Sequence, residues 1–270
     1  MSVDRRAIES LLSFWALSGV ETLYGETPVD RTAQVPLRPA TPRPATTAAP
    51  IRPMTAKAPV MAAIAPSQPD FVPLARAMAA EAGDLGALKD TIAAFEGCLL
   101  KAGARQAVFS RGPADAPLMI IGEAPGADED AQGAPFVGRA GQLLDRMLAA
   151  AGLGEKAFIS NTVFWRPPGN RTPTAAEQAV CAPFLERAIE LVKPRALLLV
   201  GGASAKAMLK TTEGILALRG RWVDWHSGDG ALTIPALPTL HPAFLLRQPA
   251  AKRKSWEDML ALTERLERPC

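Results

Sequence analysis

The chain has 270 residues, of which 48% are hydrophobic, and its formal net charge is +3. This length can bury a sizeable core, and the small positive charge permits an anionic partner without requiring one. Three scattered cysteines exclude a disulfide framework, and neither a membrane-spanning apolar run nor a secretory signal is found, so we expect a cytoplasmic protein.

The N-terminal quarter differs in composition from the rest. Residues 4–18 have the apolar spacing of a helix, and we place an N-terminal amphipathic helix within residues 1–25. A lone helix of this length is marginal in water, so its apolar face should dock either on the main domain or on a partner protein. Residues 26–70 are rich in Pro, Ala and Thr and are predicted to be a disordered linker. The compact domain is therefore predicted at residues 71–270.

From residue 71 onward, helical and strand patterns alternate. We predict one or two helices over 71–94 and helices at 140–151, 174–192, 203–210 and 255–265, with strands at 118–121, 157–160, 196–200 and 233–237. Residues 215–225 are less regular and suit a hairpin arm. The alternation predicts an α/β three-layer sandwich with a central, largely parallel four-stranded sheet flanked by helices. The loops that follow the strands should gather along one edge, where such sheets bind ligands.

Four candidate site residues fall in these loops. Glu123 lies among glycines and a proline, where its carboxylate either orients water or caps backbone N–H groups. Asn161 ends a strand, and its amide either complements the edge of a nucleobase or serves a turn. Phe136 either stacks on a flat ligand or belongs to the core. His241 can donate a hydrogen bond to an oxygen that gains charge. No cluster of Cys and His accompanies it, so we expect no metal site.

Several of these loops share their sequence with a known family. The relevant stretches are Gly-Glu-Ala-Pro-Gly-Ala-Asp-Glu-Asp-Ala-Gln-Gly-Ala-Pro-Phe-Val-Gly from Gly122 to Gly138, its continuation to Leu144, Ser160-Asn161, Arg166 to Arg171, and His-Pro-Ala-Phe-Leu-Leu-Arg from His241 to Arg247. Together they resemble the uracil-DNA glycosylase superfamily, and specifically its family-4 type, which is common in bacteria and archaea. The resemblance covers about residues 94–264 in the order of the family and leaves the N-terminal 70 residues outside.

The resemblance implies an enzyme that flips uracil out of DNA and hydrolyses its N-glycosidic bond, leaving an abasic site. By matching position, Phe136 would stack on uracil, Asn161 would bind its polar edge, and Gly122 would shape the pocket wall. His241 would bind the uracil O2 and stabilise its developing charge, while Glu123 would position the attacking water or stabilise the cationic sugar. Further residues are implied to contact DNA: Arg166, Arg171, Arg247 and Lys252 at phosphates, and Leu245 or Leu246 as a wedge in the duplex.

One part of the family pattern is incomplete. Family-4 enzymes carry four cysteines that hold a [4Fe–4S] cluster, and the matching positions here are Phe95, Cys98, Trp165 and Cys181. Two thiols are too few for a cubane cluster, so we predict no cofactor and treat Cys98 and Cys181 as remnants of the cluster site. We expect the two aromatic rings to fill the space of the cluster, although they could also point elsewhere. Zinc binding or a disulfide at the cysteine pair is less favoured.

We therefore predict a monofunctional uracil-DNA glycosylase of base excision repair. Its partner would be uracil-containing DNA, which it would engage as a monomer in the bacterial cytoplasm, associated with the nucleoid and without membrane contact. Residues 4–18 could also contact a repair or replication protein. The alternative is a catalytically weak superfamily member that acts as a DNA- or repair-protein-binding module.

Overall fold

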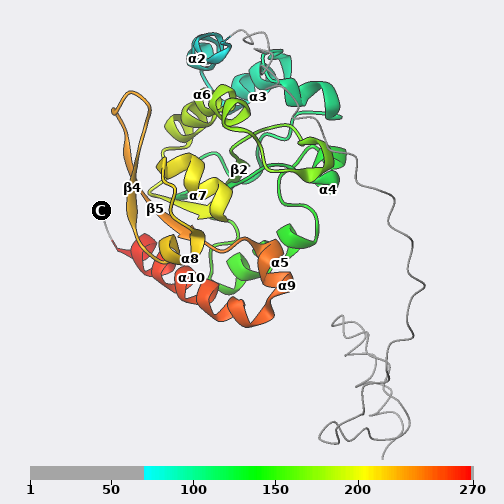
Figure 1. The fold of residues 1–270 in the computed structure, drawn as a ribbon. Coiled ribbons are helices and arrows are strands. Elements are labelled where there is room, and N and C mark those ends of the chain that lie inside the picture. Colours follow the sequence, from blue (N-terminus) through cyan, green and yellow to red (C-terminus); the bar gives the residue numbers. More distant parts are fainter. Residues whose placement is uncertain (1–69, 269–270) are drawn as a thin grey trace, which may run out of the picture. The chain divides into compact units, whose positions relative to one another are not determined.

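The computed structural model describes residues 70–268. The predicted N-terminal helix and nearly all of the predicted linker lie outside the described residues. Figure 1 shows a central sheet with helices on both faces. The strand order is β2-β1-β3-β5-β4. The strands are β1 (Leu118–Gly122), β2 (Ala157–Asn161), β3 (Ala196–Val200), β4 (Val223–His226) and β5 (Thr233–Thr239).

The four predicted strands are confirmed, and all four run parallel. The predicted number of strands is wrong, because β4 adds a fifth strand that pairs antiparallel with β5. The prediction of a hairpin arm over residues 215–225 holds only in part: its end falls in β4, which forms a hairpin with β5, whereas residues 215–218 form a short helix. In β4 only Trp225 is buried, so this edge strand has no continuous apolar run to mark it in the sequence.

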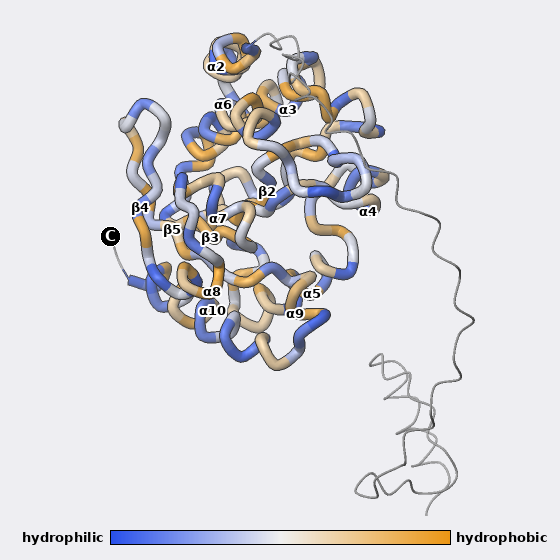
Figure 2. The backbone as a smooth tube through the Cα atoms, in the orientation of Figure 1, coloured by the Kyte–Doolittle hydropathy of each residue, from blue (hydrophilic) through white to orange (hydrophobic). Residues whose placement is uncertain are grey.

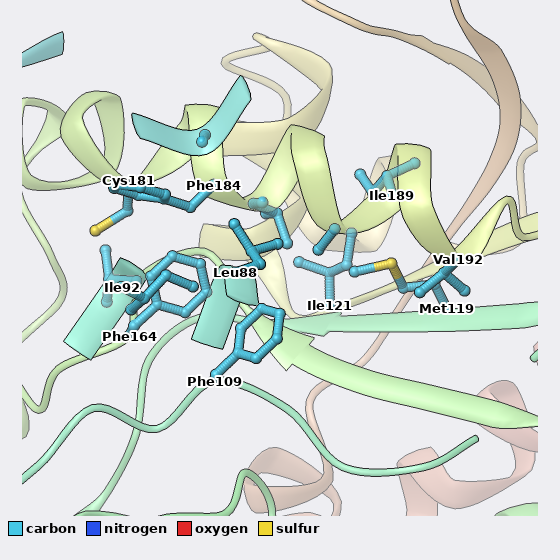
Figure 3. Close-up of a cluster of buried hydrophobic side chains, with 14 of the residues drawn as sticks. Leu88, Ile92, Phe109, Met119, Ile121, Phe164, Cys181, Phe184, Ile189 and Val192 are labelled. Carbon is cyan, nitrogen blue, oxygen red and sulfur yellow. The ribbon is translucent and has the colours of Figure 1, made fainter. Parts of the chain in front are cut away.

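Alternate residues of each buried strand pack on opposite faces of the sheet. Met119 and Ile121 of β1 belong to one buried cluster, and Leu118 and Ile120 belong to the other. Figure 3 shows the first cluster, with Met119 and Ile121 beside residues of the covering helices. The helices on that face are α2 (Val72–Glu81), α3 (Leu85–Ala94), α6 (Ala175–Val192), α7 (Gly202–Leu209) and α8 (Ile215–Leu218). The opposite face packs against α5 (Arg139–Ala150) and α10 (Lys252–Glu267).

Hydropathy along the chain follows this layering. In Figure 2 the central strands are largely hydrophobic, whereas the tip of the β4–β5 hairpin is hydrophilic. A burial pattern of this kind explains why the strands and the longer helices could be predicted from periodicity alone. Within residues 70–268, no helix is long and apolar enough to cross a membrane.

Thr174 and Glu177 have the sequence spacing of a capping box, and the start of α6 confirms this prediction. The Thr174 hydroxyl accepts a hydrogen bond from the Glu177 N–H at 3.2 Å, and the Glu177 carboxylate accepts one from the Thr174 N–H at 2.8 Å. Two six-residue helices were not predicted, α4 (Ala127–Gln132) and α9 (Pro242–Arg247). Both are too short to show helical periodicity, and both lie in loops that follow parallel strands. Three 3₁₀ turns complete the described part of the chain: η1 (Leu99–Gly103), η2 (Pro168–Asn170) and η3 (Pro249–Ala251).

Candidate active site

The carboxyl ends of the parallel strands border a pocket of about 560 Å³. Glu123, Phe136, Asn161 and His241 all line it, so the structure brings together four candidates that the sequence places in three separate loops. Parallel pairing sets Gly122 of β1 beside Asn161 of β2. An open α/β sheet binds ligands at this edge because successive strands deliver their loops there.

Asn161 presents a hydrogen-bond acceptor whose partner is missing. Its side chain is 1% exposed, and Oδ1 is buried with no partner among the described residues. A buried acceptor without a donor costs about 1–3 kcal/mol, so native proteins rarely keep one without a reason. Asn161 lines the pocket, so a ligand whose N–H donor reaches this oxygen would satisfy it.

Phe136 supplies an aromatic face to the same pocket. Its ring lies 5.9 Å from the His241 ring, centroid to centroid, with an interplanar angle of 28°. The residue has a φ of 55°, in the left-handed region that a side chain with a Cβ rarely adopts. Backbone strain of this kind persists only where the surroundings impose it, and it is often found at binding sites.

His241 is held as a neutral imidazole. Burial, followed by the charge of Arg247, lowers the pKa of His241 to about 4. Its Nδ1 accepts a hydrogen bond from the Ala243 N–H at 3.1 Å, which caps α9. A neutral imidazole carries one proton, so the acceptor role of Nδ1 assigns the proton to Nε2. His241 therefore offers the pocket an N–H donor without a positive charge.

This lowered pKa of His241 predicts a pH dependence. Above about pH 4 the folded protein keeps the ring neutral, whereas the unfolded chain takes up a proton below its ordinary pKa near 6.5. Between these values the unfolded state binds more protons, so the contribution of His241 to stability is complete above pH 6.5 and is lost as the pH falls toward 4. Ring NMR signals of the His226→Gln variant, which keeps only His241, should titrate near pH 4. A midpoint near 6.5 would contradict the burial argument.

Glu123 sits on a loop that is tied to the neighbouring strand. The Thr162 hydroxyl donates to the Glu123 carbonyl at 2.6 Å, and the Thr162 N–H donates to the Gly122 carbonyl at 3.0 Å. The Glu123 residue is half-buried at the pocket wall. Its backbone is therefore fixed relative to Asn161, while water can reach the residue.

The predicted DNA contacts are distributed unevenly. Arg171 and Arg247 line the pocket, whereas Arg166 and Lys252 lie outside its wall. The Arg171 guanidinium is bonded to both carboxylate oxygens of Glu177, at 2.9 and 2.6 Å. This pairing raises the pKa of Arg171 and lowers that of Glu177. A phosphate that contacts Arg171 would have to share it with Glu177.

The structure does not favour Leu245 as the wedge residue. Leu245 is 0% exposed, because α9 turns its side chain toward the interior, whereas the neighbouring Leu246 is 38% exposed. Of the two leucines named from the sequence, Leu246 is the one that a DNA duplex can reach.

Two further residues near the pocket were not predicted. Glu129 lines it and accepts hydrogen bonds from three backbone N–H groups, and Arg111 donates to the carbonyls of Pro135 and Phe136. For Glu129 the only sequence signal was its position three residues after Gly126, which is the spacing of a capping box. Nothing in the sequence marked Arg111.

The strand end at Gly122 leaves no room for a side chain. A Cβ at this position would collide with Asn161 Oδ1 and lie 2.6 Å from the Phe136 ring. We predict that Gly122→Ala displaces the Asn161 amide and the Phe136 ring. The affinity of the pocket for its ligand should fall by more than tenfold. The matched control is Gly83→Ala, because no atom lies within 4 Å of a Cβ there. Equal ligand binding by both variants would contradict the arrangement.

Fold and site together define a class: an α/β protein with a pocket at the carboxyl edge of a parallel sheet, lined by an aromatic ring, an amide and a neutral imidazole. The sequence profile of the uracil DNA glycosylase superfamily matches residues 109–260. The chain belongs to this superfamily.

Curated relatives support the assignment. A type-4 uracil-DNA glycosylase of Thermotoga maritima is 38% identical over 152 residues, covering 56% of this chain and 77% of the relative. Type-4 enzymes of Pyrobaculum aerophilum and Saccharolobus solfataricus are 36% and 35% identical, covering 65% and 68% of this chain and 91% and 87% of the relatives.

The residues at the four positions that the resemblance assigns to cluster ligands do not fit a [4Fe–4S] cluster. Phe95, Cys98, Trp165 and Cys181 are all buried in one hydrophobic cluster, and the Phe95 ring packs edge-on against Phe184 at 5.1 Å. The two thiols hydrogen-bond to each other, which lowers the pKa of Cys98 and raises that of Cys181. Within residues 70–268 no group of three His, Cys, Asp or Glu residues could hold a metal ion. Figure 3 shows Cys181 among apolar side chains beside Phe184.

Proposed function

We propose that this protein is a DNA repair glycosylase that removes uracil from DNA by hydrolysing its N-glycosidic bond. The observation that carries the proposal is the buried Asn161 Oδ1, an acceptor without a donor, in a pocket that also offers a neutral His241. Uracil carries an N3–H donor beside two carbonyl acceptors, so it can use both groups at once. The names of the curated relatives support the same activity.

Each of the four candidate residues has a role in this reaction. A flipped uracil stacks on Phe136 and donates its N3–H to Asn161, while its O2 accepts the N–H of His241. As the bond between C1′ and N1 breaks, its electron pair moves into the uracil ring and negative charge builds on O2. A fixed N–H donor stabilises that charge, and a neutral imidazole does so without having to lose a proton.

The sugar is the other product of bond cleavage. It develops positive charge at C1′, which the Glu123 carboxylate can stabilise, and water then adds to C1′. One proton of that water passes to the carboxylate or to solvent, and the uracil anion takes up a proton. The products are free uracil and an abasic site, with no covalent intermediate on the protein.

DNA is engaged through the rim of the pocket. Arg247, at the end of α9, together with Arg166, Arg171 and Lys252, provides positive charge for phosphates. Leu246 of α9 is exposed and would fill the gap that a flipped base leaves in the stack. We propose that the enzyme acts as a monomer on nucleoid DNA, with residues 4–18 available for a repair protein.

We further propose that the reaction needs no iron–sulfur cluster. The rings of Phe95 and Trp165 are buried where the resemblance places two of the cluster ligands, and they pack with Cys98 and Cys181 as a hydrophobic plug. The plug supports the loop before η2 and the middle of α6 by packing alone.

The test is to incubate the full chain with single- and double-stranded oligonucleotides that contain one uracil, and then to cleave abasic sites with alkali. Strand cleavage at the uracil position is expected, and none at cytosine or thymine in the same context. Measurable DNA binding without cleavage would overturn the proposal in favour of a binding module.

A further inference from the structure

Arg111 binds one side of the segment at residues 135–138, which carries the Phe136 ring. Arg111 donates through Nε to the Pro135 carbonyl at 2.8 Å and through Nη2 to the Phe136 carbonyl at 3.2 Å. The same guanidinium is paired with Asp145 of α5 at 2.6 Å. The Arg111 backbone is itself anchored, because it exchanges two hydrogen bonds with Ile159 of β2.

The Glu129 carboxylate binds the other side of the segment. Glu129 Oε1 accepts hydrogen bonds from the N–H groups of Val137 and Gly138, both at 3.0 Å. Its second oxygen, Oε2, accepts the Gly126 N–H at 3.0 Å. Gly126 belongs to the loop that carries Glu123. One carboxylate therefore ties the loop of the proposed water-binding residue to the loop of the stacking ring.

The ring needs such support because its backbone is strained. Phe136 has a φ of 55°, and the segment is pressed against α5 so closely that a Cβ on Gly141 would collide with the Phe136 carbonyl. Without its anchors the segment would relax toward a negative φ and carry the ring out of the pocket.

We propose that Glu129 and Arg111 are positioning residues that hold Phe136 at a fixed height over the base and, through Glu129, at a fixed distance from Glu123. This inference rests on the proposed function. Both Glu129 oxygens are used by amide N–H groups, so the carboxylate acts through the loops and not on the reacting atoms.

Glu129→Gln is the sharpest change at this position. Glutamine keeps the shape but has one acceptor oxygen, and its amide nitrogen would face a backbone N–H donor. A small misplacement at a reacting centre costs about 100-fold in rate, so we expect single-turnover uracil excision to fall by about that factor. Binding to duplex DNA without uracil should stay within about twofold, because phosphates make most of those contacts.

Asp84→Asn is the matched control. Asp84 is also a carboxylate that accepts a backbone hydrogen bond, from the Ala87 N–H at 2.8 Å, and it caps α3 outside the pocket wall. The Asp84→Asn variant loses the same charge as Glu129→Gln. Because Asp84 lies outside the pocket wall, the excision rate of this variant should stay at the wild-type value. Arg111→Lys is the second variant, since lysine keeps the charge but lacks the fork that reaches two carbonyls and a carboxylate. We expect it to lose about tenfold or more.

A double-mutant cycle separates positioning from a general loss of stability. If Glu129 acts largely through the ring, Glu129→Gln should cost at least about threefold less in a Phe136→Ala background than in the wild type. In that background there is no ring to place, and only the bond from the Gly126 N–H to Glu129 is still affected. Equal losses in both backgrounds would overturn the inference, as would Glu129→Gln and Arg111→Lys enzymes that work within about threefold of wild type. An inactive wild-type chain would instead overturn the proposed function.

Discussion

Replacing His241 by alanine is expected to slow uracil excision about 10²- to 10³-fold, because the variant loses the donor that faces the oxygen on which charge develops. The pocket buries this ring and holds it neutral, with its proton on Nε2. The ground-state contact with a neutral carbonyl is weaker than the contact with the developing anion. The loss should therefore appear in the single-turnover rate more than in DNA affinity.

Two controls separate this effect from damage to the fold. His241→Asn keeps an acceptor for the Ala243 N–H, and with it the cap of α9, but lacks a donor at the Nε2 position. It should be as slow as His241→Ala while unfolding at a higher temperature. His226→Ala removes the other histidine, an exposed residue of β4, and should leave the rate unchanged. A His241→Asn enzyme near the wild-type rate would remove His241 from the mechanism.

Asn161→Ala should lower the rate of uracil excision without lowering the stability of the fold. The variant loses the acceptor for the uracil N3–H. We expect the excision rate to fall about 100-fold, because the N3–H of a bound uracil would then be buried without a hydrogen-bond partner. The same change removes a buried oxygen that has no partner among the described residues. The free energy of unfolding should therefore hold or rise by about 1 kcal/mol, even though a small cavity forms.

Chemical denaturation and single-turnover excision on the same preparation check both halves of this prediction. Gln142→Ala is the matched control, since it removes an exposed amide from α5. It should change neither quantity. An Asn161→Ala protein that loses several kcal/mol of stability would show that the amide has a structural partner, and its slow excision would then say nothing about uracil.

The sequence predicted the scaffold because the scaffold depends on long regular patterns. The apolar runs at 118–121 and 196–200 read as buried strands, and the Thr174 capping box marked the start of α6. Parallel strands then required that Glu123, Asn161 and His241 meet at one edge. The edge strand β4 and the short helix α9 have too few residues for a period, and the misplacement of Leu245 follows from that.

The support of the pocket could not be predicted in the same way. Arg111 acts on carbonyls 24 and 25 residues away, and Glu129 acts on N–H groups eight and nine residues away. These carbonyl and N–H partners are backbone atoms, which carry no residue-specific signal, and the sequence does not mark the left-handed backbone of Phe136 between them either. The orphaned Asn161 oxygen is likewise a property of packing.

The central claim is that an intact base pocket excises uracil while a hydrophobic plug stands in place of a cluster. The most direct test is a paired measurement of iron per chain and of free uracil released in a single turnover, on one sample of the full chain purified without oxygen. A [4Fe–4S] cluster requires about four iron atoms per chain. We predict that uracil is released by protein whose iron content lies far below this value. Release that appears only with about four irons per chain, or no release by folded protein, would contradict the claim.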